Sequence, residues 1–468
     1  MMLTIYTFRK LALLLLMSVF ALYGTAQDNT NLSIPQEIDQ LFKDIKNEPG
    51  AAIGVLHKGE IIYQKGFGLA NLDYDIPITT KSIFELGALS MHFTGTCILL
   101  LENQGKLSLD DPIQKYLTDF PKYAKGQPTI RQCLHHSSGL RDYLEMIKMK
   151  GQQVDMAFTA KDGIDLIKRQ KKLTISPGSD YRYTNTGYLV LAAIVEQISG
   201  QTIAEFAKEN IFDPIGMTNT FYLDTKGKVI KNRAIAYEKD SMGYRMVHPF
   251  NFVTPGAMQV QTNVEDFLKW MANFEQSKIG NPDFMKQLAT QGITTHGDTM
   301  SYAVGLEDGP FWNHAMIGHN GYWQGSTAMF LRFYEDDLSI ITLSNNSDIS
   351  APQKAFQTAT QFFERPTAKI IPSTDKAASS ATPTLKIATK QLQSYCANYF
   401  NEDIGYNRKV YLKNDTLWYA NFESPDTWLQ PISNNEFKLM GMTRLFKIRF
   451  EKEAGQPIMY FRLWTIKL

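Results

Sequence analysis

Strand-forming sequence at two places far apart in the chain constrains the fold more than any other feature. Residues 51–68 (AAIGVLHKGEIIYQKGFG) contain two strand-like segments joined by a turn at Lys58 and Gly59. Residues 327–344 repeat this arrangement as TAMFLRF and LSIITLS around an acidic turn. The sequence between the two hairpins is mainly helical in pattern. We therefore predict an α+β fold in which one antiparallel sheet is assembled from both ends of a long segment.

The intervening helices differ from ordinary surface helices in their apolar content. Residues 88–104 and 185–199 are apolar nearly all round, and a glycine follows each. Such helices are buried, and a glycine just past the end is typical of a helix C-terminus. Asp111 followed by Pro112 predicts a further helix start, with the aspartate as N-cap. Residues 351–364 also have helical spacing.

The chain is too long for one hydrophobic core, because 468 residues exceed the usual size of a domain. We predict a first domain over residues 27–365 and a linker over residues 366–386, which are rich in Ala, Ser, Thr and Pro. Short strand patterns after the linker predict a small all-β domain over residues 387–468, a barrel or a sandwich.

Residues 1–26 have the organisation of a signal peptide. A basic pair, Arg9 and Lys10, precedes an apolar stretch over residues 11–23, and small residues precede position 27. We expect cleavage before Gln27, a secreted or periplasmic protein, and no membrane span after cleavage. An uncleaved membrane anchor is the alternative.

Charge and cysteine content argue against several function classes. The 48 basic and 47 acidic residues give a formal net charge of +1, and no basic run stands out, so we expect no nucleic-acid partner. Cys97, Cys133 and Cys396 show no zinc-binding spacing with histidines, so we expect neither a metal nor a cofactor. The sequence does not indicate an oligomeric state.

Five segments of the chain carry recognisable motifs. They cover residues 84–117 (starting FELGALSMHFTG), 135–140 (HHSSGL), 177–201 (starting PGSDYRYTNTG), 213–220 (DPIGMTNT) and 318–325 (GHNGYWQG). In order and spacing they resemble the serine β-lactamase and penicillin-binding-protein superfamily, which includes class C β-lactamases and D-alanyl-D-alanine carboxypeptidases. The resemblance implies a β-lactamase/transpeptidase-like fold for the first domain. We interpret the histidines of the second segment, His135 and His136, as structural.

The resemblance implies a mechanism with three elements. These are a Ser-x-x-Lys at a helix start, a Tyr-x-Asn, and a Lys-Thr-Gly or His-x-Gly on an edge strand. The second is present as Tyr183 and Asn185, and the third as His319 and Gly321. With Tyr322, whose backbone N–H would serve the oxyanion site, these residues form the expected ligand-binding set.

The first element is absent, because Ala88 and Met91 occupy the serine and lysine positions. Alanine offers no attacking atom and methionine no proton-accepting amine. Ser90 should face away from the Ala88 side of the helix. An intact Ser-x-x-Lys occurs at residues 373–376, but it falls in the predicted linker, where no buried helix could activate the lysine. We predict a protein without the family's acyl-transfer chemistry.

Three functional hypotheses follow. The first is a secreted pseudoenzyme that binds a peptide-like or carboxylate ligand or a protein partner. The second is an active hydrolase with altered chemistry that uses Tyr183 and His319. The third is an interaction protein that acts through the C-terminal β-domain, whose aromatic side chains we interpret as packing residues in preference to a sugar-binding face. Those aromatic residues are Tyr411, Trp418, Tyr419, Tyr460 and Trp464.

Overall fold

The computed structural model describes most of the chain with several gaps. The described residues are 32–151, 156–247, 251–281, 283–311, 313–364, 387–401, 406–413, 415–420, 427–439, 446–453 and 456–463. The predicted signal peptide, the predicted linker and its Ser-x-x-Lys at residues 373–376 lie outside them.

A six-stranded sheet forms the frame of the first unit, and it is built from both ends as predicted. Its strand order is β12-β13-β14-β15-β1-β2, and every neighbouring pair is antiparallel. The strands are β1 (Ala51–His57), β2 (Glu60–Phe67), β12 (Glu307–Phe311), β13 (His314–Trp323), β14 (Ser326–Phe333) and β15 (Leu338–Ser344). Ala51 pairs with Ser344, which joins the N-terminal and C-terminal hairpins in one sheet.

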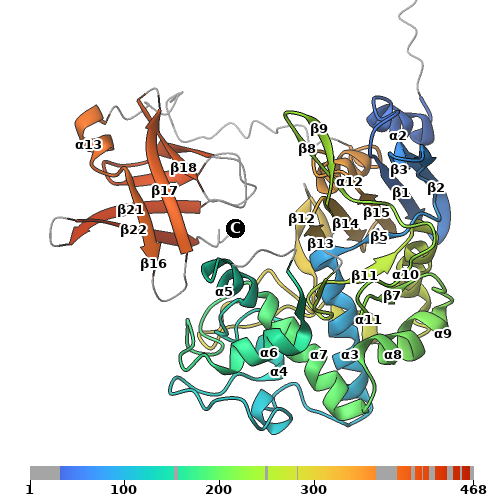
Figure 1. Ribbon diagram of the computed structural model, residues 1–468, viewed down its shortest axis with the longest axis horizontal. Coiled ribbons are helices and arrows are strands. Elements are labelled where there is room, and N and C mark those ends of the chain that lie inside the picture. The colour runs from blue at the N-terminus through green and yellow to red at the C-terminus, as the bar shows by residue number, and fades with distance from the viewer. Residues whose placement is uncertain are drawn as a thin grey trace, which may run out of the picture.

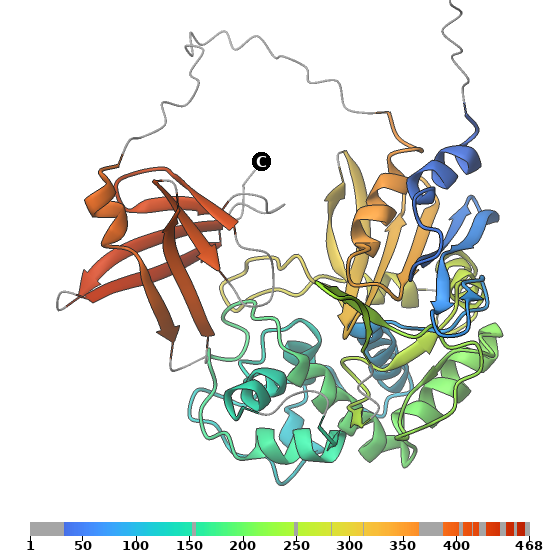
Figure 2. The same ribbon diagram turned by 45° about the horizontal axis from the view of Figure 1, so that its top comes forward.

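Each face of this sheet carries a separate hydrophobic core, because neighbouring strand residues point to opposite sides. Ala51, Ile53 and Val55 of β1 pack with helices α2 (Ile34–Phe42) and α12 (Ala351–Ala359). Ala52 and Leu56 belong to the larger core on the other face, which includes α10 (Val264–Gln276) and the helical region. Figures 1 and 2 show the helices flanking the sheet in this way. Helix α12 is shorter than the predicted 351–364.

The two apolar helices form the buried centre of the helical region. Helix α3 (Met91–Asn103) follows a 3-10 turn, η1 (Gly87–Ser90), and α7 (Asn185–Ser199) packs against α3. Helix α7 has the predicted bounds. The remaining helices are α4 (Ile130–Leu134), α5 (Tyr143–Met149), α6 (Ala160–Lys168), α8 (Ile203–Ala207), α9 (Asp213–Ile215) and α11 (Phe284–Leu288), with a π-turn η3 (Lys208–Phe212).

The helix start predicted with Asp111 as N-cap is wrong by one residue. Only a 3-10 turn, η2 (Ile113–Lys115), forms, and Pro112 is the extended residue that precedes it. Asp111 instead accepts hydrogen bonds from the Ser108 N–H, at 2.9 Å, and from the side chains of Lys115 and Tyr116. An aspartate that closes such a turn gives the same local sequence signal as an N-cap.

A three-stranded ribbon leads into η1 and therefore positions the candidate site. Its order is β5 (Phe84–Glu85), β11 (Val260–Thr262) and β7 (Phe221–Tyr222). The other short strands pair in twos: β3 (Leu69–Asn71) with β4 (Ile76–Pro77), β6 (Phe158–Thr159) with β10 (Phe252–Val253), and β8 (Tyr237–Asp240) with β9 (Gly243–Met246).

The C-terminal unit is all-β apart from one short helix, α13 (Thr389–Gln393), and has a core of its own. Seven strands follow one another in sequence order in a single sheet. They are β16 (Ala397–Asn401), β17 (Tyr406–Lys413), β18 (Thr416–Ala420), β19 (Thr427–Pro431), β20 (Glu436–Leu439), β21 (Phe446–Glu453) and β22 (Gln456–Leu463). The sequence shows a strand pattern at β17, β18, β20, β21 and β22 but not at β16 or β19. Tyr419 is buried, Tyr411 and Trp418 are half-buried, and Trp464 and the Tyr460 side chain lie outside the described part.

Two absences hold within the described ranges. No single helix there has both the length and the apolar composition to cross a membrane, although the bent pair Asn185–Ser199 and Ile203–Ile215 passes that test by length and composition alone. No group of three or more His, Cys, Asp or Glu side chains is arranged to hold a metal ion.

Candidate functional site

The site lies where the start of η1 meets the end of β13. Gly87 has a φ of 55°, and a Cβ there would lie 2.7 Å from the Tyr322 backbone nitrogen. A Cβ on Gly321 would lie 1.7 Å from the Leu86 carbonyl oxygen. Only glycine therefore permits the two backbones to approach so closely. The contact brings the backbone segment that contains Ala88 close to the one that contains Tyr322, as an oxyanion site requires.

Ala88 and Met91 lie on one side of the helix start because a 3-10 turn repeats every three residues. Met91 is completely buried, and the hydroxyl oxygens of Tyr183 and Tyr302 each lie 3.6 Å from its sulfur. Ser90 faces the core, where its Oγ accepts a hydrogen bond from the Val260 N–H at 3.0 Å. The predicted orientation of Ser90 is therefore confirmed.

Tyr302 links Met91 to the buried His319. Its hydroxyl lies 3.1 Å from Nε2 of His319, while Nδ1 of that ring is bonded to the Asn320 carbonyl. Because a carbonyl only accepts, Nδ1 carries the proton and Nε2 accepts from Tyr302. Burial lowers the pKa of His319, so the imidazole is neutral near pH 7.

Tyr183 stands at the opening of the site, with 39% of its surface exposed. Its ring centroid lies 6.4 Å from that of His319, and its hydroxyl end is directed at Met91. Desolvation of that end raises the pKa of Tyr183 well above 10, and the field of Asp142 adds to the increase. Tyr183 is consequently a neutral phenol that can donate a hydrogen bond but cannot act as a base.

Asn185 is held in place by a buried carboxyl group. Asp142 accepts from the Asn185 backbone N–H at 2.6 Å and from its side-chain amide at 2.9 Å. The other oxygen of Asp142 caps helix α5 by accepting from the Leu144 N–H at 2.9 Å. Burial raises the pKa of Asp142. The Asn185 amide is therefore oriented by the scaffold.

The two histidines interpreted as structural are indeed buried and bonded. Nδ1 of His136 accepts from the Thr184 N–H at 3.2 Å, and its ring lies 4.3 Å from that of Tyr183. Nδ1 of His135 lies 3.3 Å from the Tyr302 carbonyl oxygen. Both rings support the segments that carry the two tyrosines.

Sequence reasoning missed three residues around this site. Tyr302 lies in a segment without a recognisable motif, so nothing in the sequence pointed to it. Asp142 could have been recognised as an N-cap, because it precedes the apolar-periodic segment YLEMI. Glu85, whose Oε1 accepts from the Gly87 N–H at 3.3 Å, was hidden within the first motif region.

The described residues of the site offer hydrogen-bonding groups to a carbonyl or carboxylate group. Ala88 and Met91 stand at the positions where the resemblance would place the serine and the lysine, and both Tyr183 and His319 are neutral. Tyr322 and Asn320 are exposed at the rim. What remains is a set of backbone and side-chain hydrogen-bonding groups.

Comparison with known proteins gives a consistent result along the chain. The family model described as Beta-lactamase matches residues 38–359. Penicillin-binding protein 4* of Bacillus subtilis (strain 168) is 28% identical over 353 residues, which are 70% of this chain and 75% of that protein. A D-aminopeptidase of Gluconobacter oxydans (strain 621H) is 24% identical over 309 residues, or 66% of this chain and 57% of the relative. The chain thus spans little more than half of that second relative.

Solved structures share the fold at lower sequence identity. The octameric penicillin-binding protein homologue from Pyrococcus abyssi has a TM-score of 0.63 and 22% identity, covering 91% of this chain and 96% of that one. The D-amino acid amidase from Ochrobactrum anthropi SV3, complexed with L-phenylalanine, has a TM-score of 0.59 and 20% identity, covering 70% and 97%. At this identity the likeness concerns the fold alone.

Proposed function

The chain belongs to the beta-lactamase family, and from that premise we propose that it is an inactive member that binds a peptide-like or carboxylate ligand without reacting with it. The observation that carries the proposal is the environment of Met91. Its thioether occupies the lysine position with two tyrosine hydroxyls directed at the sulfur. Neither a nucleophile nor a base is present where the family's chemistry would occur.

Loss of the lysine also changes the tyrosine. A cationic amine beside Tyr183 would lower the pKa of its phenol, whereas burial and the Asp142 carboxylate raise it. Removal of the nucleophile from such a catalytic unit reduces turnover by on the order of 10⁶. We infer that Tyr183 now serves as a hydrogen-bond donor to a bound ligand.

The free edge of β13 supports a peptide-like ligand. On the β12 side, pairing ends at Gly318, which lies opposite Glu307, whereas β13 continues to Trp323 along β14. The residues beyond Gly318 thus present one edge to η1 and to whatever occupies the site. A peptide segment can pair with such an edge through its main chain. The names of the relatives, a D-aminopeptidase and a penicillin-binding protein, are compatible with this ligand class.

Two assays on the purified protein test the loss of chemistry. Incubation with a reactive penicillin should leave the intact mass unchanged, and D-phenylalanine p-nitroanilide should release no nitroaniline above the buffer rate. The variant that carries both Ala88→Ser and Met91→Lys is the matched positive control. A stoichiometric adduct on the unmodified chain, or hydrolysis abolished by Tyr183→Phe, would instead support an enzyme with altered chemistry.

A third assay tests binding. The protein should release a small molecule on denaturation, detectable by mass spectrometry, and His319→Ala should reduce its amount because the ring orders Tyr302 beside the site. Tyr322→Ala, at a 54% exposed position, should reduce it without affecting folding. If both variants release as much of the small molecule as the original protein does, any ligand must bind elsewhere.

A further inference from the structure

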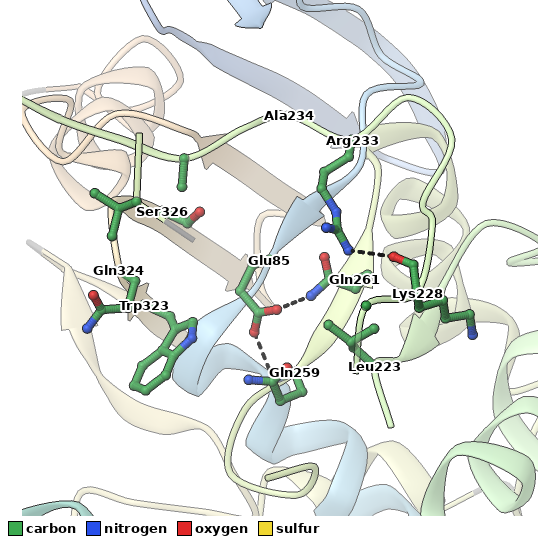
Figure 3. Close-up of a pocket in the computed structure, with 13 residues that line it drawn as sticks. Glu85, Leu223, Lys228, Arg233, Ala234, Gln259, Gln261, Trp323, Gln324 and Ser326 are labelled. Atoms are coloured by element: carbon green, nitrogen blue, oxygen red, sulfur yellow. Dashed lines mark hydrogen bonds between the residues drawn. The ribbon is translucent and has the colours of Figure 1, made fainter. Parts of the chain in front are cut away.

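A second polar pocket is lined by residues of β5 and of the end of β13. Its walls come from β5, β11, the turn that follows β13, and the loop that precedes β8 (Figure 3). The cavity has a volume of about 50 Å³. One buried water needs roughly 10–15 Å³ by this measure, so the cavity holds a group of about four heavy atoms.

One wall is a half-buried, hydrogen-bonded carboxyl group. Glu85 accepts from the Gln259 N–H at 2.8 Å and from the side-chain amide of Gln261. Both glutamines are nearly inaccessible, with 2% and 4% of their surfaces exposed. Desolvation raises the pKa of Glu85 to about 7, although its hydrogen bonds and Arg233 oppose the increase. Near neutral pH this wall therefore carries only part of a negative charge.

The opposite wall contains a donor that lacks an acceptor. Trp323 is 8% exposed, and its indole N–H has no hydrogen-bond partner within the described ranges. Figure 3 shows the nitrogen edge of the indole facing Glu85 across the pocket. A buried N–H without an acceptor destabilises the folded state. Such a group is therefore evidence for an acceptor that occupies the cavity.

One cationic side chain, that of Arg233, completes the polar lining, whereas Lys228 directs its ammonium away from Glu85. Arg233 donates from Nη2 to the Lys228 carbonyl at 3.4 Å, and the Lys228 ammonium lies 4.4 Å from the centre of the Phe221 ring. Burial lowers the pKa of Arg233, but an arginine stays protonated at any physiological pH. With Glu85 only partly ionised, the pocket has a net positive charge.

We propose that this pocket binds a small carboxylate anion, which accepts a hydrogen bond from the Trp323 indole and is attracted by the positive charge of Arg233. A guanidinium stays charged at physiological pH, so this attraction does not depend on pH. The protonated form of Glu85 removes the repulsion that a second carboxylate would otherwise meet. This site is distinct from the Ala88 site, although Glu85 connects the two through its hydrogen bond to the Gly87 N–H.

The test follows the Trp323 indole N–H directly. In protein labelled with ¹⁵N at tryptophan, the chain gives six indole signals, and Trp323→Phe identifies the relevant one. Sodium acetate is titrated at pH 7 against sodium chloride at equal ionic strength. We expect a saturable shift of the Trp323 signal, with half-saturation in the millimolar range. Acetamide, a neutral molecule of the same size, should shift it at least tenfold less effectively.

Matched variants assign the charge contribution. Arg233→Gln should weaken acetate binding at least tenfold, whereas Arg131→Gln, which removes a distant arginine paired with Asp110, should leave it unchanged. Circular dichroism confirms that each variant is folded. A Trp323 signal that does not respond to 100 mM acetate would show a cavity filled by water alone. An equal response to acetamide would show that the pocket does not recognise the negative charge. Either result would overturn the proposal. The penicillin and amide assays are unaffected by either outcome.

Discussion

We infer that the side chain at position 91 decides whether the neighbouring polar groups can carry out acyl transfer. A methionine has about the length of a lysine, and its polarizable sulfur tolerates two hydroxyl groups at 3.6 Å. A lysine there would need its charge to be balanced by the same neutral tyrosines, which destabilises the folded state. With methionine at this position, the buried end of the site carries no charge, and its polar groups are the two tyrosine hydroxyls.

Reversal of two residues should restore chemistry. Ala88→Ser alone should form no adduct with a reactive penicillin, because an unactivated hydroxyl is a poor nucleophile. Ala88→Ser with Met91→Lys should form one, since the new amine lies beside Tyr183 and the serine. The same variant should have a lower Tm, because the lysine must be buried. Intact-mass spectrometry and thermal unfolding measure the two effects.

The singly substituted Met91→Lys protein is the control for stability. A folded double variant that forms no adduct with penicillins or activated esters would contradict the view that only the nucleophile and base were lost. In that case the wider site, including the Asp142–Asn185 arrangement, would have diverged as well.

Glu85 should contribute to the unfolding free energy a stabilising part that decreases as the pH rises. Its folded-state pKa of about 7 lies above the ordinary value of 4.5, so the folded state holds the proton more tightly. The contribution is fully present below pH 4.5 and is lost as the pH rises through about 7. Glu85→Gln removes this titration. We expect the unfolding free energy of the original protein to fall relative to the variant, by about 1–3 kcal/mol between pH 5 and 8.

Denaturant unfolding at four pH values in that range measures the difference. Glu265→Gln provides a comparison with another half-buried glutamate, which accepts from the Thr80 hydroxyl. A constant difference between the original protein and Glu85→Gln would show that Glu85 is already ionised at pH 5.

At the scale of elements, the contact between η1 and β13 is the most demanding feature of the site. Gly321→Ala would place a methyl group against the Leu86 carbonyl, so β13 must move away from η1. We expect a loss of about 1–3 kcal/mol or more in unfolding free energy, together with loss of ligand binding. Gly309→Ala in the neighbouring strand β12 meets nothing within 4 Å and should change neither. Chemical denaturation of both variants provides the comparison. Equal stabilities would mean that β13 can move away from η1 at little energetic cost.

An element could be predicted from the sequence where neighbouring residues determine its structure, and not where contacts in the tertiary fold do. The hairpin turn at Lys58 and Gly59 has φ values of 51° and 78°, which match the sequence signal, and the α7 pattern ended where its glycine predicted. The motif residues Tyr183 and His319 could also be placed in advance. Tyr302 could not, because it reaches Met91 and His319 only through the tertiary fold. Strands β16 and β19 have no distinct alternation of apolar and polar residues.

At the scale of the whole molecule, the hydrophobic cores of the two units share no residue. The C-terminal core includes Leu392, Val410 and Phe437, and none of these belongs to the cores of the first unit. We expect a protein that ends at residue 365 to fold with a Tm within a few degrees of the corresponding transition in the full chain. Differential scanning calorimetry measures both. If the truncated protein keeps its ligand, the hypothesis that the C-terminal domain carries the function is contradicted.

We further propose that the protein is exported and processed. The apolar stretch over residues 11–23 and the small residues after it predict cleavage before Gln27. The protein recovered from the periplasm or the medium should have an intact mass that begins at Gln27. Recovery with residues 1–26 still attached would support the membrane-anchor alternative.

The pairing of β1 with β15 also has a consequence for synthesis. The Ser344 hydroxyl donates to the Gly50 carbonyl, 294 positions earlier in the chain. At 5–20 residues per second, the ribosome needs roughly 15 to 60 s to make the partner of a strand that it has already finished. During that interval the apolar faces of β1 and β2 have no sheet to join. The sheet therefore cannot form until β15 has been made, so the nascent chain stays unfolded in this region. An unfolded chain is the state that a translocation channel accepts and a chaperone recognises.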